Sequence, residues 1–73
     1  MRNMTRRHDE ILAIIREASV SVTVGDLADF VTEISRASII NIALDLFGSG
    51  YVVYDRINGR NAYRITARGR AAA

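Results

Sequence analysis

The sequence contains no cysteine, no proline, no tryptophan and no lysine, and its one histidine is His8. Without cysteine the chain cannot form a disulfide. A single histidine also falls short of the three or four convergent ligands that a zinc site needs. These are the devices that most often stabilise very small domains. Stability must therefore come from ordinary packing, to which a second copy of the chain can add.

The sequence also lacks any long apolar run. No segment approaches the roughly 20 apolar residues of a membrane span, and the polar N-terminus, residues 1–10, contains no signal-peptide core. The 73 residues leave room for one domain. We expect a cytoplasmic protein with no membrane partner, a single domain over residues 1–73, with its core at about 5–66 and a basic tail at 67–73.

Positive charge is concentrated at the two ends of the chain. The formal net charge is only +2, and every one of the ten basic residues is arginine. The eight acidic residues all fall within residues 9–55, where Arg16 and Arg36 are the basic residues. From Arg56 onward the chain has arginines and no acid. A polyanionic partner would therefore meet the two ends rather than the middle.

Capping residues and apolar periodicity predict three helices. The first spans about residues 5–18, with Thr5 as a candidate N-cap. The second opens at Thr23 and Asp26, which match a capping box, and should end near Thr32. The third follows Ser35 as N-cap and runs to about residue 47, where Gly48-Ser49-Gly50 suits a helix C-terminus.

The third helix is unusually apolar. Its central stripe, at helical spacing, is Ile39, Ile42, Ala43 and Leu46. Ile40, Leu44 and Phe47 widen this stripe beyond a normal core face. Two interpretations stay open: the helix packs on two sides within the domain, which is the commoner case, or the extra residues form an exposed patch for dimerisation.

A β-hairpin is predicted near the C-terminus. Residues 51–54 and 62–66 are rich in strand-forming side chains, and Asn58-Gly59 between them favours a type I′ turn. The residues expected to face the core are Val52, Tyr54, Tyr63 and Ile65. Residues 20–22 alternate like a very short third strand. The predicted fold class is thus α+β, three helices with a C-terminal two-strand hairpin.

Three segments then resemble a known superfamily. Asp26-Leu27-Ala28 followed by Ile34-Ser35-Arg36-Ala37-Ser38-Ile39 resembles a helix-turn-helix. Leu46-Phe47-Gly48-Ser49-Gly50-Tyr51-Val52 resembles the exit of a recognition helix into a wing strand. Tyr63-Arg64-Ile65-Thr66-Ala67-Arg68-Gly69 is similar to the run that closes the wing. Over about residues 5–70 the chain therefore resembles the winged helix-turn-helix domains, small DNA-binding regulators.

The resemblance implies that the third helix enters the major groove of double-stranded DNA. The residues placed to contact DNA there are Ser35, Arg36, Ala37, Ser38 and Asn41. Asn41 suits adenine, and Arg36 suits guanine or a phosphate. The hairpin would reach the backbone or minor groove through Arg56, Asn58, Arg60 and Asn61. Further phosphate contacts would come from Arg6, Arg7, Arg64, Arg68 and Arg70.

Several of these residues have simpler explanations. Capping alone accounts for Ser35, and turn geometry alone for Asn58. The turn before the third helix holds Thr32-Glu33 where many helix-turn-helix segments have glycine, and the outward face of that helix carries Asp45. A rival hypothesis follows: a protein-interaction module that uses the acidic second helix and the apolar third helix.

No enzyme is predicted. His8, Asp9 and Glu10 are consecutive on a helix, so their side chains diverge and cannot form a metal or acid–base site. No serine has a neighbouring histidine and acid. Gly48-Ser49-Gly50 follows a helix, whereas phosphate-binding loops precede one. We therefore expect a transcription regulator without cofactor or metal, acting as a homodimer on palindromic DNA, or, in the rival hypothesis, binding a protein partner through the third helix.

Overall fold

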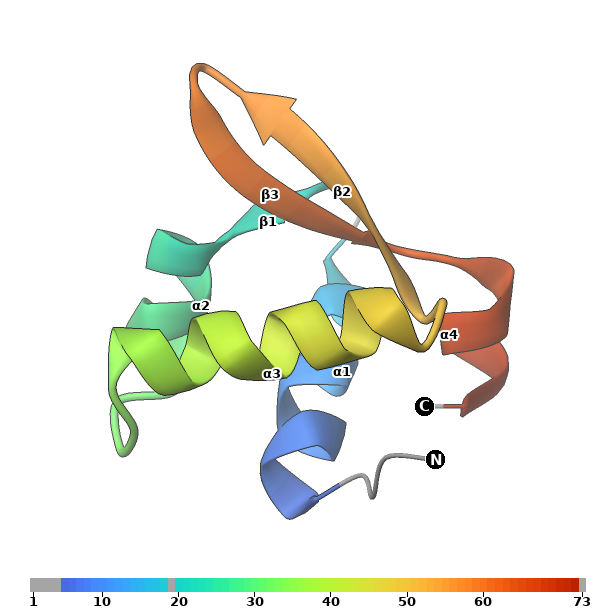
Figure 1. Ribbon diagram of the computed structural model, residues 1–73, viewed down its shortest axis with the longest axis horizontal. Coiled ribbons are helices and arrows are strands. Elements are labelled where there is room, and N and C mark those ends of the chain that lie inside the picture. The colour runs from blue at the N-terminus through green and yellow to red at the C-terminus, as the bar shows by residue number, and fades with distance from the viewer. Residues whose placement is uncertain (1–4, 19, 73) are drawn as a thin grey trace.

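The computed structural model describes residues 5–18 and 20–72. In chain order the elements are α1 (Arg6–Glu17), β1 (Val22–Thr23), α2 (Val24–Phe30), α3 (Arg36–Gly48), β2 (Val52–Ile57), β3 (Arg60–Ile65) and α4 (Ala67–Ala72) (Figure 1). The strands form one antiparallel sheet in the order β1-β3-β2. The α+β class is confirmed, but the described residues form four helices rather than three.

Side-chain caps begin the first three helices where the sequence predicted them. The Thr5 hydroxyl accepts the backbone N–H of His8, and the Ser35 hydroxyl accepts that of Ser38. At the start of α2, Thr23 and Asp26 satisfy each other's backbone N–H groups at 3.1 Å in both directions. α2 ends at Phe30, two residues before the predicted end.

The C-terminus of α3 lies in the predicted glycine segment. The N–H of Tyr51 donates to the carbonyl of Leu46, and the N–H of Gly50 donates to that of Phe47, both at 3.0 Å. This pair of bonds is a Schellman motif, which needs a left-handed residue after the helix. Gly50 provides it with φ of 80°.

The hairpin forms about the predicted turn. Ile57 pairs with Arg60, and the two residues between them have positive φ, 51° at Asn58 and 77° at Gly59, as a type I′ turn requires. The short strand is shifted from its predicted position. β1 begins at Val22 and pairs with Tyr63 and Ala62 of β3, while Val20, expected to be in it, lies outside and is exposed.

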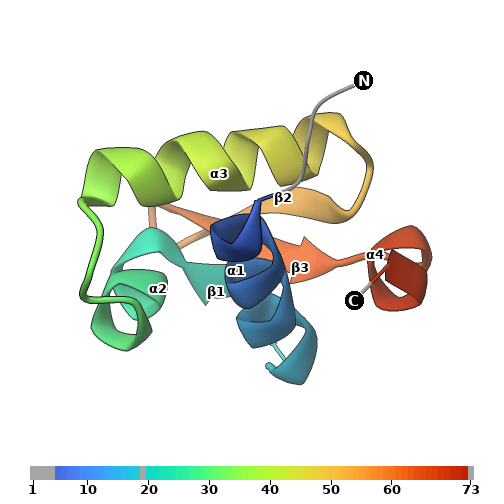
Figure 2. The same ribbon diagram turned by 90° about the horizontal axis from the view of Figure 1, so that it is seen from below.

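The core lies between the sheet and the helices α1 and α3 (Figure 2). The predicted central stripe of α3 is entirely buried. The largest fully buried side chains are Ile11, Leu12, Ile15, Leu27, Ile39, Leu46, Val52 and Tyr63. Burying these apolar side chains supplies most of the folding free energy in a domain of this size.

Tyr54 is a correction to the predicted core. Its partners in the prediction, Val52, Tyr63 and Ile65, are buried, but Tyr54 is 42% exposed. Its ring meets Phe47 and Tyr63 edge-on, with centroid distances of 6.0 and 5.4 Å. Tyr54 is on the same side of β2 as the buried Val52, two residues nearer the tip of the hairpin, which projects away from the helices (Figure 1).

Residues 67–72, within the segment described as a basic tail, form a fourth helix that the sequence did not predict. The Thr66 hydroxyl accepts the N–H of Gly69 and lies 2.7 Å from the carbonyl oxygen of Gly50, to which it donates. Gly69 is buried against the backbone of Tyr51, whose carbonyl oxygen a Cβ at that position would strike. α4 is therefore packed against the turn that joins α3 to β2.

Candidate nucleic-acid interface

The N-terminal half of α3 presents most of the predicted base-contacting residues to solvent. Arg36, Ala37 and Asn41 are exposed, as is Ser35 just before the helix. Ser38 is half-buried, and its hydroxyl accepts a hydrogen bond from the Ser35 hydroxyl at 3.1 Å. The two serines thus form a local cap, and the polar groups directed outward are those of Arg36 and Asn41.

The sequence predicted that Asp45 lies on the outward face of α3, but the structure shows its side chain in contact with α1. Its side chain is half-buried, and one carboxylate oxygen is 3.1 Å from Nε2 of His8 on α1. The contact joins the N-terminal part of α1 to the C-terminal part of α3. The acid that counted against DNA binding is therefore part of a link between helices.

The hairpin tip and α3 enclose one groove. Its volume is about 530 Å³, and it is lined by Thr23, Val24, Gly25, Arg36, Ile40, Gly59, Arg60 and Asn61. Figure 1 shows the hairpin projecting on the side of α3 where its N-terminal half and α2 lie. Three predicted site residues meet here, Arg36 from the start of α3 and Arg60 and Asn61 from the start of β3.

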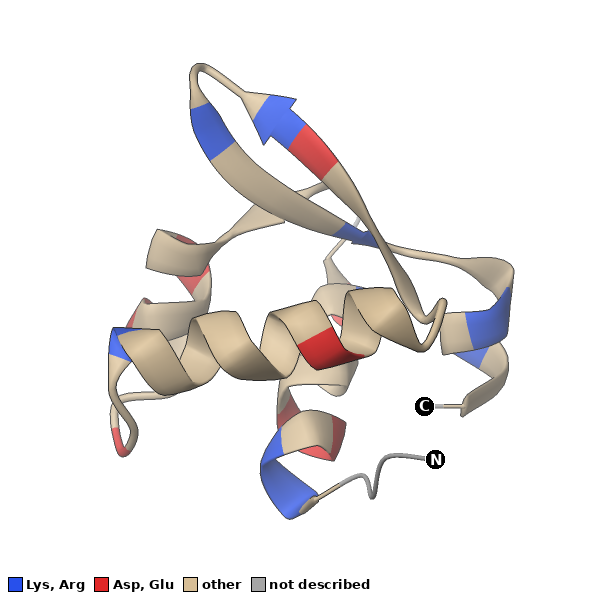
Figure 3. Ribbon diagram, viewed as in Figure 1, with Lys and Arg blue, Asp and Glu red and all other residues tan. Residues whose placement is uncertain are grey.

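The other predicted residues of the hairpin tip are Arg56 and Asn58, and both are exposed. Arg56 donates from Nη2 to the carbonyl of Gly59 at 3.4 Å, across the turn. Within the described residues, no carboxylate pairs with Arg36, Arg56 or Arg60. Figure 3 shows arginines on both strands near the hairpin tip and one at the start of α3.

Arg64 is not brought together with these residues. Side chains alternate across a strand, so Arg64 points away from the side on which Tyr63 and Ile65 are buried. Its Nε donates to Asp55 at 3.1 Å, and the Ser21 hydroxyl donates to the same carboxylate oxygen at 2.8 Å. Arg64 and then Ser21 hold the pKa of Asp55 below its usual value.

The remaining phosphate candidates are mostly engaged within the protein. Arg7 bridges Glu10 at 2.9 Å and Glu33 at 3.3 Å, and Arg6 contacts Glu10 at 3.2 Å. The hydrogen bond with Arg7 lowers the pKa of Glu33. The Arg68 guanidinium lies 5.3 Å from the ring centre of Tyr51, and Arg70 is exposed.

Four exposed residues, which we call the apolar stripe, run along α3 and onto β2. They are Ile40 at 39% exposure, Leu44 at 47%, Phe47 at 47% and Tyr54 at 42%. The interpretation that the three α3 residues belong to the core is wrong. α3 packs against α1, α2 and β2, and the side of the helix that faces them carries the buried Ile39 and Leu46.

No protein-family model matches the chain, and no curated protein matches it. Over residues 5–18 and 20–72, no three His, Cys, Asp or Glu side chains gather as metal ligands would. The helices in that part of the chain are all too short or too polar to cross a bilayer. The candidate site is therefore judged on its own geometry.

Proposed function

We propose that the chain is a winged helix-turn-helix domain that binds double-stranded DNA and regulates transcription. The order of its elements supports this, with α2 and α3 as the helix-turn-helix and the β2–β3 hairpin as the wing. The observation that carries the proposal is the convergence of Arg36, Arg60 and Asn61 around one groove. Arginine and asparagine are the side chains best suited to base edges and phosphates.

In this proposal α3 lies in the major groove with its N-terminal half against the bases. Asn41 is exposed there and bonds the edge of an adenine, while Arg36 bonds guanine or a phosphate. Arg56 and Arg60 on the wing contact the backbone or the adjacent minor groove. Because one domain covers a short stretch of DNA, two copies bind a palindromic site, each with its own α3.

The test is fluorescence anisotropy with random-sequence duplex DNA over a series of salt concentrations. Wild type is compared with Arg56→Ala/Arg60→Ala, and Arg16→Ala is the control because it removes an exposed arginine of α1 outside the groove. Each lost phosphate contact should reduce the slope of log K against log salt by about 0.9. We expect a reduction of about 1.8 for the double variant and little change for the control.

Absence of binding by wild type at low salt would contradict the proposal. Equal weakening by Arg16→Ala and by either wing arginine alone would contradict the role of the wing, because general charge would then explain the affinity.

The apolar stripe favours a second candidate, a protein-interaction module on the same scaffold. Large apolar side chains exposed side by side are typical of protein contacts. A contact through Leu44 and Phe47 should be nearly insensitive to salt, whereas DNA binding weakens steeply as salt rises. The same salt series therefore distinguishes the two candidates when it is repeated with a purified protein partner.

A further inference from the structure

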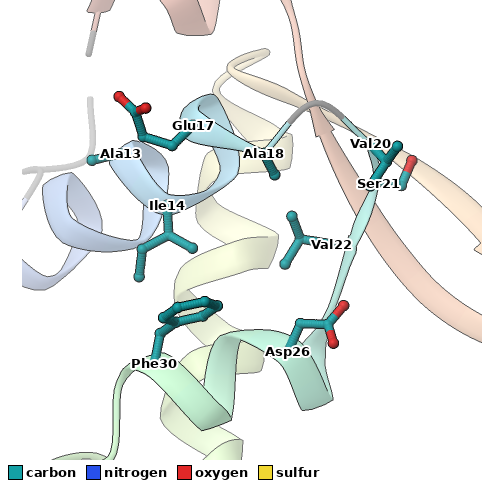
Figure 4. Close-up of a pocket in the computed structure, with 9 residues that line it drawn as sticks. All are labelled: Ala13, Ile14, Glu17, Ala18, Val20, Ser21, Val22, Asp26 and Phe30. Carbon is teal, nitrogen blue, oxygen red and sulfur yellow. The ribbon is translucent and has the colours of Figure 1, made fainter.

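A second groove lies between α1, β1 and α2 and shares no lining residue with the groove at the wing. Its volume is about 460 Å³, within the range of small-molecule sites. Figure 4 shows the side chains of Ile14, Val22 and Phe30 surrounding the hollow, with Ala18 at its far end. The groove thus has three walls from three consecutive elements.

The floor of the groove includes the buried Val22, and its rim includes two apolar side chains that the fold leaves exposed. Phe30, the last residue of α2, is 72% exposed, and Val20 is 70% exposed, although both lie beside the half-buried Ile14 and Ala18. An aromatic ring exposed to that extent contributes little to the folded core. It does offer a ligand a large apolar contact area.

The charged residues that line this groove are both carboxylates, Glu17 and Asp26. Both are exposed. Asp26 uses one oxygen to accept the N–H of Thr23, and within the described residues Glu17 takes part in no ion pair. An occupant with a positive charge is therefore favoured. A second copy of this groove is disfavoured, because it would bring like charges together.

We propose that the groove binds a small amphipathic cation, a compound with a short alkyl or aromatic body and one ammonium group. The body lies against Phe30, Ile14 and Val22, and the ammonium group lies at the rim, where Glu17 and Asp26 both contribute negative charge. This binding does not depend on the proposed contact with DNA, because the two grooves are separate.

The test uses three probes with one apolar body and different head groups: hexylammonium, 1-hexanol and hexanoate. Each is titrated into the ¹⁵N-labelled full chain, and amide chemical shifts report both affinity and location. We expect hexylammonium to bind about fivefold more tightly than hexanol and hexanoate to bind most weakly. The shifts should be largest along residues 13–18, 20–22 and 26–30.

Two exposed aromatic residues provide matched variants. Phe30→Ser should weaken hexylammonium binding about tenfold, whereas Phe47→Ser, in the apolar stripe, should leave it unchanged. Glu17→Gln should reduce the preference for hexylammonium over hexanol and leave hexanol binding as it was. Circular dichroism checks that each variant is folded, which we expect because all three side chains are exposed.

Three results would overturn the proposal. They are no saturable binding by any probe, equal affinity for the three head groups, and shifts centred on the apolar stripe with loss of binding in Phe47→Ser rather than Phe30→Ser. The last would show that the probes collect on any exposed apolar surface.

Discussion

His8 is a buried polar residue, 7% exposed, whose side chain takes part in the N-terminal cap of α1 and also contacts α3. Its Nδ1 is 3.3 Å from the backbone N–H donor of Thr5 and 2.7 Å from the Thr5 hydroxyl. Nδ1 accepts the backbone N–H of Thr5, so the tautomer that matches both contacts carries its ring proton on Nε2. That Nε2–H then donates to Asp45.

Replacing His8 should separate its two roles. His8→Ala removes the capping bond and the link to Asp45, and we expect it to lower the free energy of unfolding by about 1–3 kcal/mol. His8→Gln keeps a side chain that can complete the capping box but is not expected to reach Asp45, so it should lose less. Urea denaturation measures the free energy of unfolding of both variants. Equal decreases would show that the capping bond contributes nothing to stability.

Asp55 should make stability depend on pH in the acid range. Arg64 and Ser21 lower its folded-state pKa, so the carboxylate stabilises the fold above its unfolded-state pKa of about 3.9. That stabilisation is lost as pH falls through the lower folded-state value. The difference in unfolding free energy between wild type and Asp55→Asn should therefore be largest near neutral pH and shrink in acid. Asp29→Asn, an exposed acid of α2, is the control, and a pH-independent difference would contradict the prediction.

Residues whose role is local were predictable from the sequence. The caps at Thr5, Thr23 and Ser35 depend on atoms three residues away, so sequence spacing alone identified them. The part that His8 takes in the first cap was missed, because imidazole is not the usual partner at that position. Tyr54 was wrongly predicted to be buried. Strand alternation predicts which side of a strand a residue is on, but not how far along the strand that side is covered by other elements.

At the scale of elements, α3 and α4 show which packing a sequence reveals. The buried stripe of α3 was predictable because its side chains recur at helical spacing. α4 has no such stripe. It is fixed by the Thr66 hydroxyl and by close approach of Gly69 to the backbone of Tyr51, and backbone contacts of this kind leave no periodic signal.

The close approach of α4 predicts unequal costs for two glycine substitutions. Gly69→Ala places a methyl group against the Tyr51 carbonyl oxygen and the Ile65 side chain, which should destabilise the fold by about 1–3 kcal/mol. Gly48→Ala is the control, because a Cβ at the end of α3 meets nothing within 4 Å. It should be neutral or stabilise by up to about 1 kcal/mol. Thermal unfolding distinguishes the two variants. Equal melting temperatures would show that α4 does not pack against the turn at Tyr51.

For the molecule as a whole, both candidate functions use α3. Asn41, which the proposal places against DNA, is next to Ile40 and three residues from Leu44 on α3, so association through the apolar stripe would compete with DNA for this helix. If copies associate through the stripe, linkage requires that DNA and self-association oppose each other. The apolar stripe and the groove between the hairpin tip and α3 share one residue, Ile40.

Leu44→Ser should separate these two activities. Leu44 is 47% exposed, so the change should leave the fold intact while reducing self-association in sedimentation velocity experiments over a range of concentrations. DNA affinity should be unchanged or higher, because a competing contact is weakened. Arg60→Ala should do the reverse, lowering DNA affinity with no effect on self-association. Loss of both activities in each single variant would contradict this division.

The candidate site was only partly predictable at this scale. Nothing in the residue pattern predicts that Arg36 lies beside the same groove as Arg60 and Asn61, because that depends on how the hairpin is oriented relative to α3. The residue pattern also could not show that Arg7 is paired with Glu33, which lies 26 residues further along the chain. Long-range ion pairs of this kind are visible only once the chain is folded.

The strand order β1-β3-β2 also leaves β2 at the edge of the sheet. An edge strand offers unpaired backbone groups to strands of other molecules, and Val52–Ile57 is otherwise a good template for such cross-molecular pairing. Asp55 and Arg56 interrupt it with adjacent charges of opposite sign, which discourages fibril formation. A variant that removes either charge should be studied at low protein concentration, because the edge of β2 then offers a less interrupted strand to other molecules.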